Sequence, residues 1–289
     1  MARLSPLFTY SLRMAVEGTS TPRGVRPAWL ARAADVRLVD YGNSNGETLL
    51  HVEAPALGQA APELFEQARL WPQGPEPEIT AVDLAGSAVE DVRAANADSM
   101  LYDRPLLIRI ARLRQLLDKA LKRVDVPAGI NGARSVPLDR QAVTNARQLS
   151  DRTPAPQEAR VVGVLDMVRY STRTFALKMA DGSEVRGVLE QAEQIESIGR
   201  LLNRKVLVLG RAVYRPSGAV LRIEARAVAE GEGQPPLFEK VPAPRRSRPP
   251  VVRFKPGEAR SWLDSFFGKW PGDETDEELL ATLHEIRHR

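Results

Sequence analysis

Hydrophobic and polar side chains alternate along residues 8–16, and this period of two predicts a half-buried strand. Apolar segments at 36–41 and 48–53 flank the sequence Gly-Asn-Ser-Asn-Gly, whose residues tolerate the positive φ angles of a tight turn. These two segments are therefore expected to pair as a β-hairpin.

Helical periodicity dominates the rest of the first 129 residues. It is clearest over 104–123, where Asp103 can cap the helix and Pro105 lies in the first turn. Apolar residues at spacings of three and four form one stripe on this helix: Leu106, Ile110, Leu113, Leu117 and Leu121. Further helices are expected over 27–35, 61–70 and 80–95. Residues 1–129 are therefore predicted to form a mixed α+β domain.

Residues 159–229 carry the most regular strand pattern in the chain. Segments rich in Val, Leu and Phe predict strands at 160–169, 174–179, 184–189, 205–214 and 219–228, with a helix at 190–202. The sequence Asp181-Gly182 is a strong hairpin turn between the second and third strands. Three strands, a helix and two strands resemble the oligonucleotide/oligosaccharide-binding (OB) fold, a small five-stranded barrel.

Two segments between these regions differ from them in composition. Residues 130–158 place glycines and prolines around one short helix and are predicted to connect the α+β domain to the barrel. Residues 230–257 contain seven prolines, which favour extended polyproline II and do not build a core. This linker is expected to tether a last segment, residues 258–289, to the barrel.

The C-terminal segment is strongly apolar again, at helical spacing. Its first cluster recurs at i, i+1, i+4, i+5 and i+8 and consists of Trp262, Leu263, Phe266, Phe267 and Trp270. A capping box of Thr275 and Glu278 predicts a second helix, whose apolar residues are Leu279, Leu283 and Ile286. Four carboxylates surround its start: Asp273, Glu274, Asp276 and Glu277. Helices this short are marginal in water, so the segment either folds back on the body or docks in a partner's groove.

Part of this segment resembles a known family. Residues 266–279 read Phe-Phe-Gly-Lys-Trp-Pro-Gly-Asp-Glu-Thr-Asp-Glu-Glu-Leu, which is similar to the C-terminal tails of bacterial antitoxins encoded beside toxins with PIN-type ribonuclease domains. The resemblance implies a tail that wraps a protein partner, the toxin, and occupies its basic, metal-binding active site. It favours a non-catalytic, antitoxin-like protein, in which the aromatic residues anchor the tail and the carboxylates face the partner's basic or metal-coordinating groups.

The distribution of charge leaves a nucleic-acid-binding alternative open. Residues 159–229 hold 12 Lys and Arg against 7 Asp and Glu, a net charge of +5, whereas the whole chain has +4. The cations that could contact phosphates of single-stranded nucleic acid are Arg169, Lys178, Arg211, Arg215, Arg222 and Arg226. Aromatic stacking partners are few, namely Tyr170, Phe175 and Tyr214, so a scaffold or protein-docking role for the barrel is the preferred interpretation.

Few residues suit catalysis. The chain has no cysteine, which excludes thiolate zinc sites and cysteine nucleophiles, and it has three histidines. The sequence His284-Glu285-Ile286-Arg287-His288 matches the zinc-protease pattern, but no third ligand follows it, so a zinc hydrolase is only a remote alternative. The carboxylates Asp83, Glu90, Asp91 and Asp98 are interpreted as a solvated helix face, and His51 as a strand residue. We therefore expect no catalytic residue, no bound metal and no cofactor.

The remaining composition is that of a globular protein, with 43% hydrophobic and 27% charged residues. No apolar run approaches the ~20 residues that a membrane-spanning helix needs. The first residues contain no apolar stretch of signal-peptide length. Together with the lack of cysteine, these features predict a cytoplasmic protein without a membrane partner.

Overall fold

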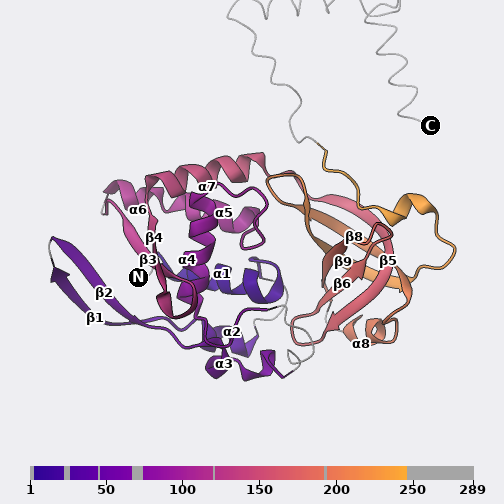
Figure 1. Cartoon of the computed structure of the whole chain (residues 1–289), viewed down its shortest axis with the longest axis horizontal. Coiled ribbons are helices and arrows are strands. Elements are labelled where there is room, and N and C mark those ends of the chain that lie inside the picture. The colour runs from indigo at the N-terminus through magenta and orange to yellow at the C-terminus, as the bar shows by residue number, and fades with distance from the viewer. Residues whose placement is uncertain are drawn as a thin grey trace, which may run out of the picture. The chain divides into compact units, whose positions relative to one another are not determined.

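The computed structural model of this chain describes residues 3–22, 27–44, 46–66, 74–119, 121–191 and 194–245. The chain divides into two compact units, Met1–Ser247 and Arg248–Arg289. The first unit is α+β and includes a closed β-barrel, as the sequence predicts (Figure 1). The helices predicted within 258–289 lie outside the described residues, as does the predicted linker from residue 246 onward.

The first element is a helix, α1 (Ser5–Glu17), and the strand predicted over 8–16 is wrong. Pro6 lies in the first turn of α1, and Gly18 ends the helix in the left-handed conformation, with φ of 67°. Most side chains of α1 are buried, including Arg13, which pairs with Glu17 one turn later at 2.6 Å between Nη2 and Oε2. A helix that is buried on most of its surface has no broad polar face. The alternation of hydrophobic and polar residues over 8–16 is therefore unrelated to the conformation of this segment.

The next helices follow the predicted ranges in part. α2 (Ala28–Ala33) and α4 (Ala81–Arg93) lie within the segments predicted to be helical. Between them come a short helix, α3 (Leu57–Ala60), and a 3-10 turn, Pro62–Leu64. That turn is the described part of the helix predicted over 61–70, since residues from 67 onward lie outside the described ranges.

The longest predicted helix is divided in two. α5 spans Arg104–Arg112 and α6 spans Arg114–Lys119. Asp103 caps α5 as predicted, because its Oδ1 accepts the N–H of Leu106 at 3.3 Å. The predicted apolar stripe is buried as far as Leu117, whereas Leu121 is 41% exposed. The helical pattern in the sequence therefore extends beyond the residues that the fold buries.

Residues 130–158, predicted as a connector with one short helix, contribute two elements to the first part of the body. β4 (Arg134–Leu138) pairs antiparallel with β3 (Val124–Ala128). α7 (Arg140–Arg152) follows, and its N-terminus is capped by Asp139, whose Oδ1 accepts the N–H of Ala142 at 2.9 Å.

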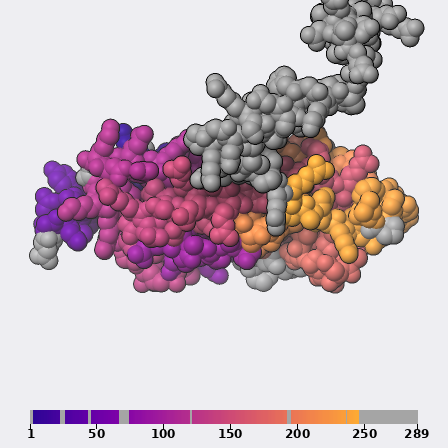
Figure 2. Space-filling model, turned by 90° about the horizontal axis from the view of Figure 1, so that it is seen from above, coloured from indigo at the N-terminus to yellow at the C-terminus, as the bar shows by residue number. Residues whose placement is uncertain are grey.

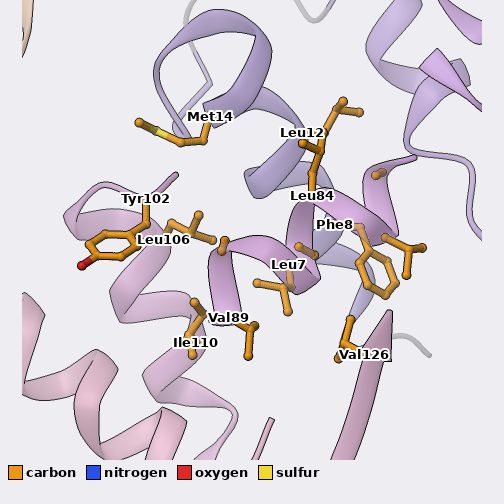
Figure 3. Packing of buried hydrophobic residues seen from close by; sticks show 14 of the residues in the cluster. Leu7, Phe8, Leu12, Met14, Leu84, Val89, Tyr102, Leu106, Ile110 and Val126 are labelled. Atoms are coloured by element: carbon orange, nitrogen blue, oxygen red, sulfur yellow. The ribbon is translucent and has the colours of Figure 1, made fainter. Parts of the chain in front are cut away.

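The apolar core of this first part lies between α1, α4, α5 and α7. Leu7, Val89 and Ile110 point toward one another there (Figure 3). α4 approaches β3 closely at Gly86, where an added Cβ would lie 1.9 Å from the carbonyl oxygen of Pro127. Only glycine therefore fits at this contact between helix and strand.

β1 (Arg37–Ser44) and β2 (Glu47–Glu53) form the hairpin that the sequence predicts. Among the described residues they make a separate two-stranded sheet. The hairpin extends away from the helices and lies at one edge of the described part of the chain (Figure 1 and Figure 2).

The second part of the body is a closed five-stranded barrel with strand order β5-β6-β7-β9-β8. Its strands are β5 (Gln157–Arg169), β6 (Thr174–Lys178), β7 (Glu184–Leu189), β8 (Lys205–Tyr214) and β9 (Val220–Glu230). α8 (Gln194–Gly199) lies between β7 and β8 in the sequence. β7 and β9 are parallel, and the other neighbours are antiparallel. The predicted OB-like barrel, with five strands and a helix after the third, is therefore confirmed.

The interior of the barrel is packed by side chains from all five strands. Phe175 on β6 lies directly opposite Gly187 on β7 and is fully buried, so its ring is not available to stack on a base. A Cβ at Gly187 would lie 2.0 Å from Cζ of the Phe175 ring. The ring therefore occupies the space that a larger residue on β7 would take.

Candidate functional site

All residues predicted to bind a protein partner lie between 262 and 286, outside the described residues. The histidines of the zinc-protease pattern, at 284 and 288, lie there as well. The candidates that the structure places are the six cations of the barrel, the carboxylates between residues 83 and 98, and His51.

The outer face of the barrel packs against the helical part of the body. OB-like barrels bind ligands on the face of their second and third strands and at the loop between the last two strands. On that face Val188 of β7 is 4% exposed, and its Cγ2 lies 3.7 Å from the place of a Cβ on Gly18, at the end of α1. In the loop between β8 and β9, the N–H of Ser217 donates to Ala97 O at 3.2 Å. Helical segments therefore cover part of the usual ligand surface.

A buried network of charges joins the two parts of the body at this junction. Asp103 before α5 is fully buried, and its Oδ2 lies 3.1 Å from Nη2 of Arg222 on β9. The same oxygen accepts the N–H of Ser20 at 3.1 Å. Nη2 of Arg222 also lies 2.9 Å from Oε1 of Glu224. Oε2 of Glu224 in turn lies 3.1 Å from Nη2 of Arg211. The guanidinium of Arg222 is thus held between two carboxylates, one from each part of the body.

A cavity of about 320 Å³ lies beside this network. Three strands each contribute an arginine to its lining: Arg169 from β5, Arg186 from β7 and Arg222 from β9. The rest of the lining is largely apolar and includes Met14 of α1 and Leu101 before α5. Burial lowers the pKa of the Arg169 guanidinium, and the charge of Arg186 lowers it further.

Arg222, which lines this cavity, keeps one polar atom unpaired among the described residues. Its side chain is 4% exposed, and its Nε and Nη2 both donate to Glu224. In the part of the chain that the structure describes, Nη1 of Arg222 is buried and has no hydrogen-bond partner. A buried polar atom without a partner is unusual in folded proteins and calls for an explanation.

A second cavity, of about 720 Å³, adjoins the first. Met100, Arg186 and Leu221 line both. The second cavity is more polar and has mixed charges, because its lining also includes Arg215 and Glu184. Residues of β7 and β9 line both cavities, whereas the larger one is otherwise bordered mainly by the barrel and by residues 239–241.

The six cations predicted to contact nucleic acid occupy different environments. Arg211, Arg222 and Arg226 each form an ion pair with a carboxylate, which reduces the charge that they offer to phosphates. Arg215 donates from Nη1 to Asp98 O at 3.0 Å. Lys178 is exposed at the end of β6. Of the six residues, Arg169 and Arg222 are brought together at the smaller cavity.

Two of the four candidate carboxylates between residues 83 and 98 stabilise local structure. Asp83 forms a capping box with Thr80 at the start of α4, and its Oδ1 accepts the N–H of Gly132 at 3.0 Å. Glu90 pairs with Arg134 at 2.9 Å. Among the described residues no group of three His, Asp or Glu side chains is arranged to hold a metal ion. The Asp83 carboxylate, predicted to be solvated, is instead buried.

The hairpin presents an uncovered apolar surface. Its apolar face combines the cross-strand neighbours Tyr41 and Leu50 with the pair Leu38 and Val52. Tyr41 is 69% exposed and Leu50 is 45% exposed. The opposite face carries the pair Asp40 and His51 and also Leu49, which is 49% exposed. A two-stranded sheet with several large apolar side chains in solvent is typical of a surface that binds another molecule.

Sequence reasoning missed both the exposure of the hairpin and the role of Arg186. The apolar residues of 36–41 and 48–53 gave a correct strand pattern, but a pattern does not say whether a face is covered. Arg186 alternates with apolar residues on β7, and this alternation could have identified it as a cation on the barrel's outer face.

Comparison with known proteins gives no match. No family model, no curated protein and no solved structure matches this chain. Among the described residues, no helix is both long and apolar enough to cross a membrane.

Proposed function

We propose that this chain is a non-catalytic, antitoxin-like protein that binds and inhibits a basic partner protein, a PIN-type ribonuclease, through residues 258–289. The observation that carries the proposal is the sequence of residues 262–286, whose apolar stripes and neighbouring carboxylates resemble antitoxin tails. The apolar stripes need a surface to cover them, and a partner's groove supplies one. Since such a ribonuclease acts on cellular RNA, the proposal also places the protein in the bacterial cytoplasm.

Charge supports a basic partner. Residues 258–289 hold four Lys and Arg against eight Asp and Glu, a net charge of −4. Residues 37–53 of the hairpin hold one Arg against three Asp and Glu, a net charge of −2. Both surfaces would therefore attract the same positively charged protein, and their complementarity would speed the encounter.

The apolar face of the hairpin is proposed as a second contact with this partner. Its exposed residues cover too little area to hold a stable complex alone, because specific interfaces bury about 800 Å² on each side. Linked to a binding segment at the C-terminus, a weak second contact still raises the overall affinity.

The tail is tested with the full-length chain and the variant Trp262→Ala/Phe266→Ala/Trp270→Ala. Truncating one buried aromatic anchor typically costs about 2 kcal/mol or more, so the variant should bind the purified ribonuclease at least about 30-fold more weakly and should not inhibit it. Leu237→Ala is the matched control, because Leu237 is an apolar residue of the body that is 80% exposed. The proposal fails if the full-length chain captures no ribonuclease, or if the triple variant inhibits it as well as the parent does.

The hairpin is tested with a cross-strand pair and a control that keeps its charge. Tyr41→Ser/Leu50→Ser changes the apolar face, and His51→Gln changes the opposite face without removing a carboxylate. The first variant should weaken binding to the same ribonuclease, and the second should leave it nearly unchanged. Equal affinities for both variants would contradict the second contact. Loss of a dimer in light scattering would instead assign the face to a second copy of this chain.

A further inference from the structure

We propose that the smaller cavity at the junction of barrel and helices binds a small phosphate monoester through Arg169, Arg186 and Arg222. The site is independent of the C-terminal segment, so this inference goes beyond the proposed function. Its residues lie between 14 and 222, within the body.

The first observation is the convergence of three guanidinium groups on one cavity. They come from three different strands, β5, β7 and β9, and no local sequence pattern brings them together. The pKa of Arg169 is lowered by burial and by the charge of Arg186, which means that its charged form is disfavoured where it lies. An anion in the cavity would reverse this effect, because it stabilises every nearby cation.

The second observation is the unpaired Nη1 of Arg222. Nη2 pairs with the carboxylates of Asp103 and Glu224, and Nε donates to Glu224. These contacts hold the guanidinium plane in one orientation. Nη1 is buried without an acceptor among the described residues, and the Arg222 side chain is part of the cavity lining. A phosphate oxygen is a suitable acceptor, since the planar guanidinium fork matches the geometry of phosphate.

The remaining walls indicate what the phosphate carries. Met14, Met100 and Met167 line the cavity, with further apolar side chains around them. Methionine adapts its shape to flat or irregular apolar groups. The two cavities, of about 320 and 720 Å³, lie in the size range of small-molecule sites, ~300–1,000 Å³. A phosphate monoester with a flat organic group, such as a mononucleotide, fits this combination of charge and apolar surface.

The test uses the full-length chain and isothermal titration at low salt. The probes are adenosine 5′-monophosphate and phenyl phosphate, and the matched compounds without phosphate are adenosine and phenol. At least one of the two monoesters should bind, and neither adenosine nor phenol should. A single-stranded oligothymidylate forms a further arm of the experiment.

Two charge-matched variants make the test specific. Arg186→Gln changes an exposed side chain that lines both cavities. The variant should bind the monoester about tenfold more weakly than the parent does. Arg160→Gln removes an exposed charge from β5 outside the cavity lining and should leave the affinity unchanged. Equal weakening in both variants, or binding of neither monoester to the parent, would overturn the proposal. Binding of the oligonucleotide alone would overturn it as well, in favour of a nucleic-acid-binding barrel.

Discussion

The substitution Asp103→Asn tests whether the buried network holds the two parts of the body together. Asparagine keeps an oxygen that can cap α5, but its NH2 group replaces Oδ2, which accepts from the N–H of Ser20 and pairs with Arg222. Breaking a buried ion pair costs about 3–5 kcal/mol, because the remaining charge stays buried. Glu224 still lies 2.9 Å from Arg222, which places the expected loss near the lower end, at about 3 kcal/mol.

Urea denaturation followed by circular dichroism and by tryptophan fluorescence measures this loss. With an m-value of about 3 kcal/mol/M, a loss of 3 kcal/mol lowers the midpoint by about 1 M urea. Asp151→Asn is the matched control, because Asp151 is an exposed carboxylate on α7 and its substitution should change stability by less than about 0.5 kcal/mol. If Asp103→Asn shifts the midpoint no more than this control does, the network contributes no net stability and the reasoning is refuted.

A double variant separates the ion pair from general damage to the junction. In Asp103→Asn/Arg222→Met the second substitution removes the charge that the first leaves behind. The double variant should therefore be more stable than the sum of the two single losses implies, with a coupling energy of about 1–3 kcal/mol. Simple additivity would show that the two residues do not interact.

Two further predictions concern the cores. Gly187→Ala should destabilise the barrel by about 1–3 kcal/mol in urea, since its Cβ would overlap the ring of Phe175, whereas Gly42→Ala on the exposed hairpin, with open space around it, should have little effect. Burial raises the pKa of Tyr102 above its ordinary value of about 10, so the native state keeps a proton that the unfolded chain loses. This contribution to stability is complete below about pH 10 and declines as the pH rises further. If Tyr102→Phe lowers the tyrosinate absorbance that the folded protein shows at pH 10, the prediction is contradicted, because the exposed tyrosines contribute equally to both proteins.

The barrel was the part most open to prediction from the sequence. Its strands alternate between a packed interior and an outer face, so their period is visible, and β8 has the predicted bounds 205–214. Asp103 and Pro105 likewise marked the start of α5, because caps act within a few residues of each other. Strand periodicity and helix caps depend on residues that are close in the sequence, so the sequence alone predicts them.

The errors and omissions involve contacts between distant residues. α1 was taken for a strand because tertiary burial on most of its sides removed the polar face that marks a surface helix. The pairing of Asp103 with Arg222 joins positions 119 residues apart in the sequence, and neither residue signals the other. The same holds for the three arginines of the cavity, which became a candidate site only when the barrel closed and packed against the helices.

This packing also bears on the choice between a polymer and a small ligand. A single-stranded nucleic acid on an OB-like barrel needs an open face for about 4–16 nucleotides. Here Val188 on that face is buried beside Gly18, and the loop at 215–219 is hydrogen-bonded to Ala97. Beside β7 and β9 the described residues line cavities of about 320 and 720 Å³, in the size range of small-molecule sites. A ligand there would contact both parts of the body at once, so its binding should stabilise the junction, and Asp103→Asn should weaken its affinity without changing a residue of the cavity lining.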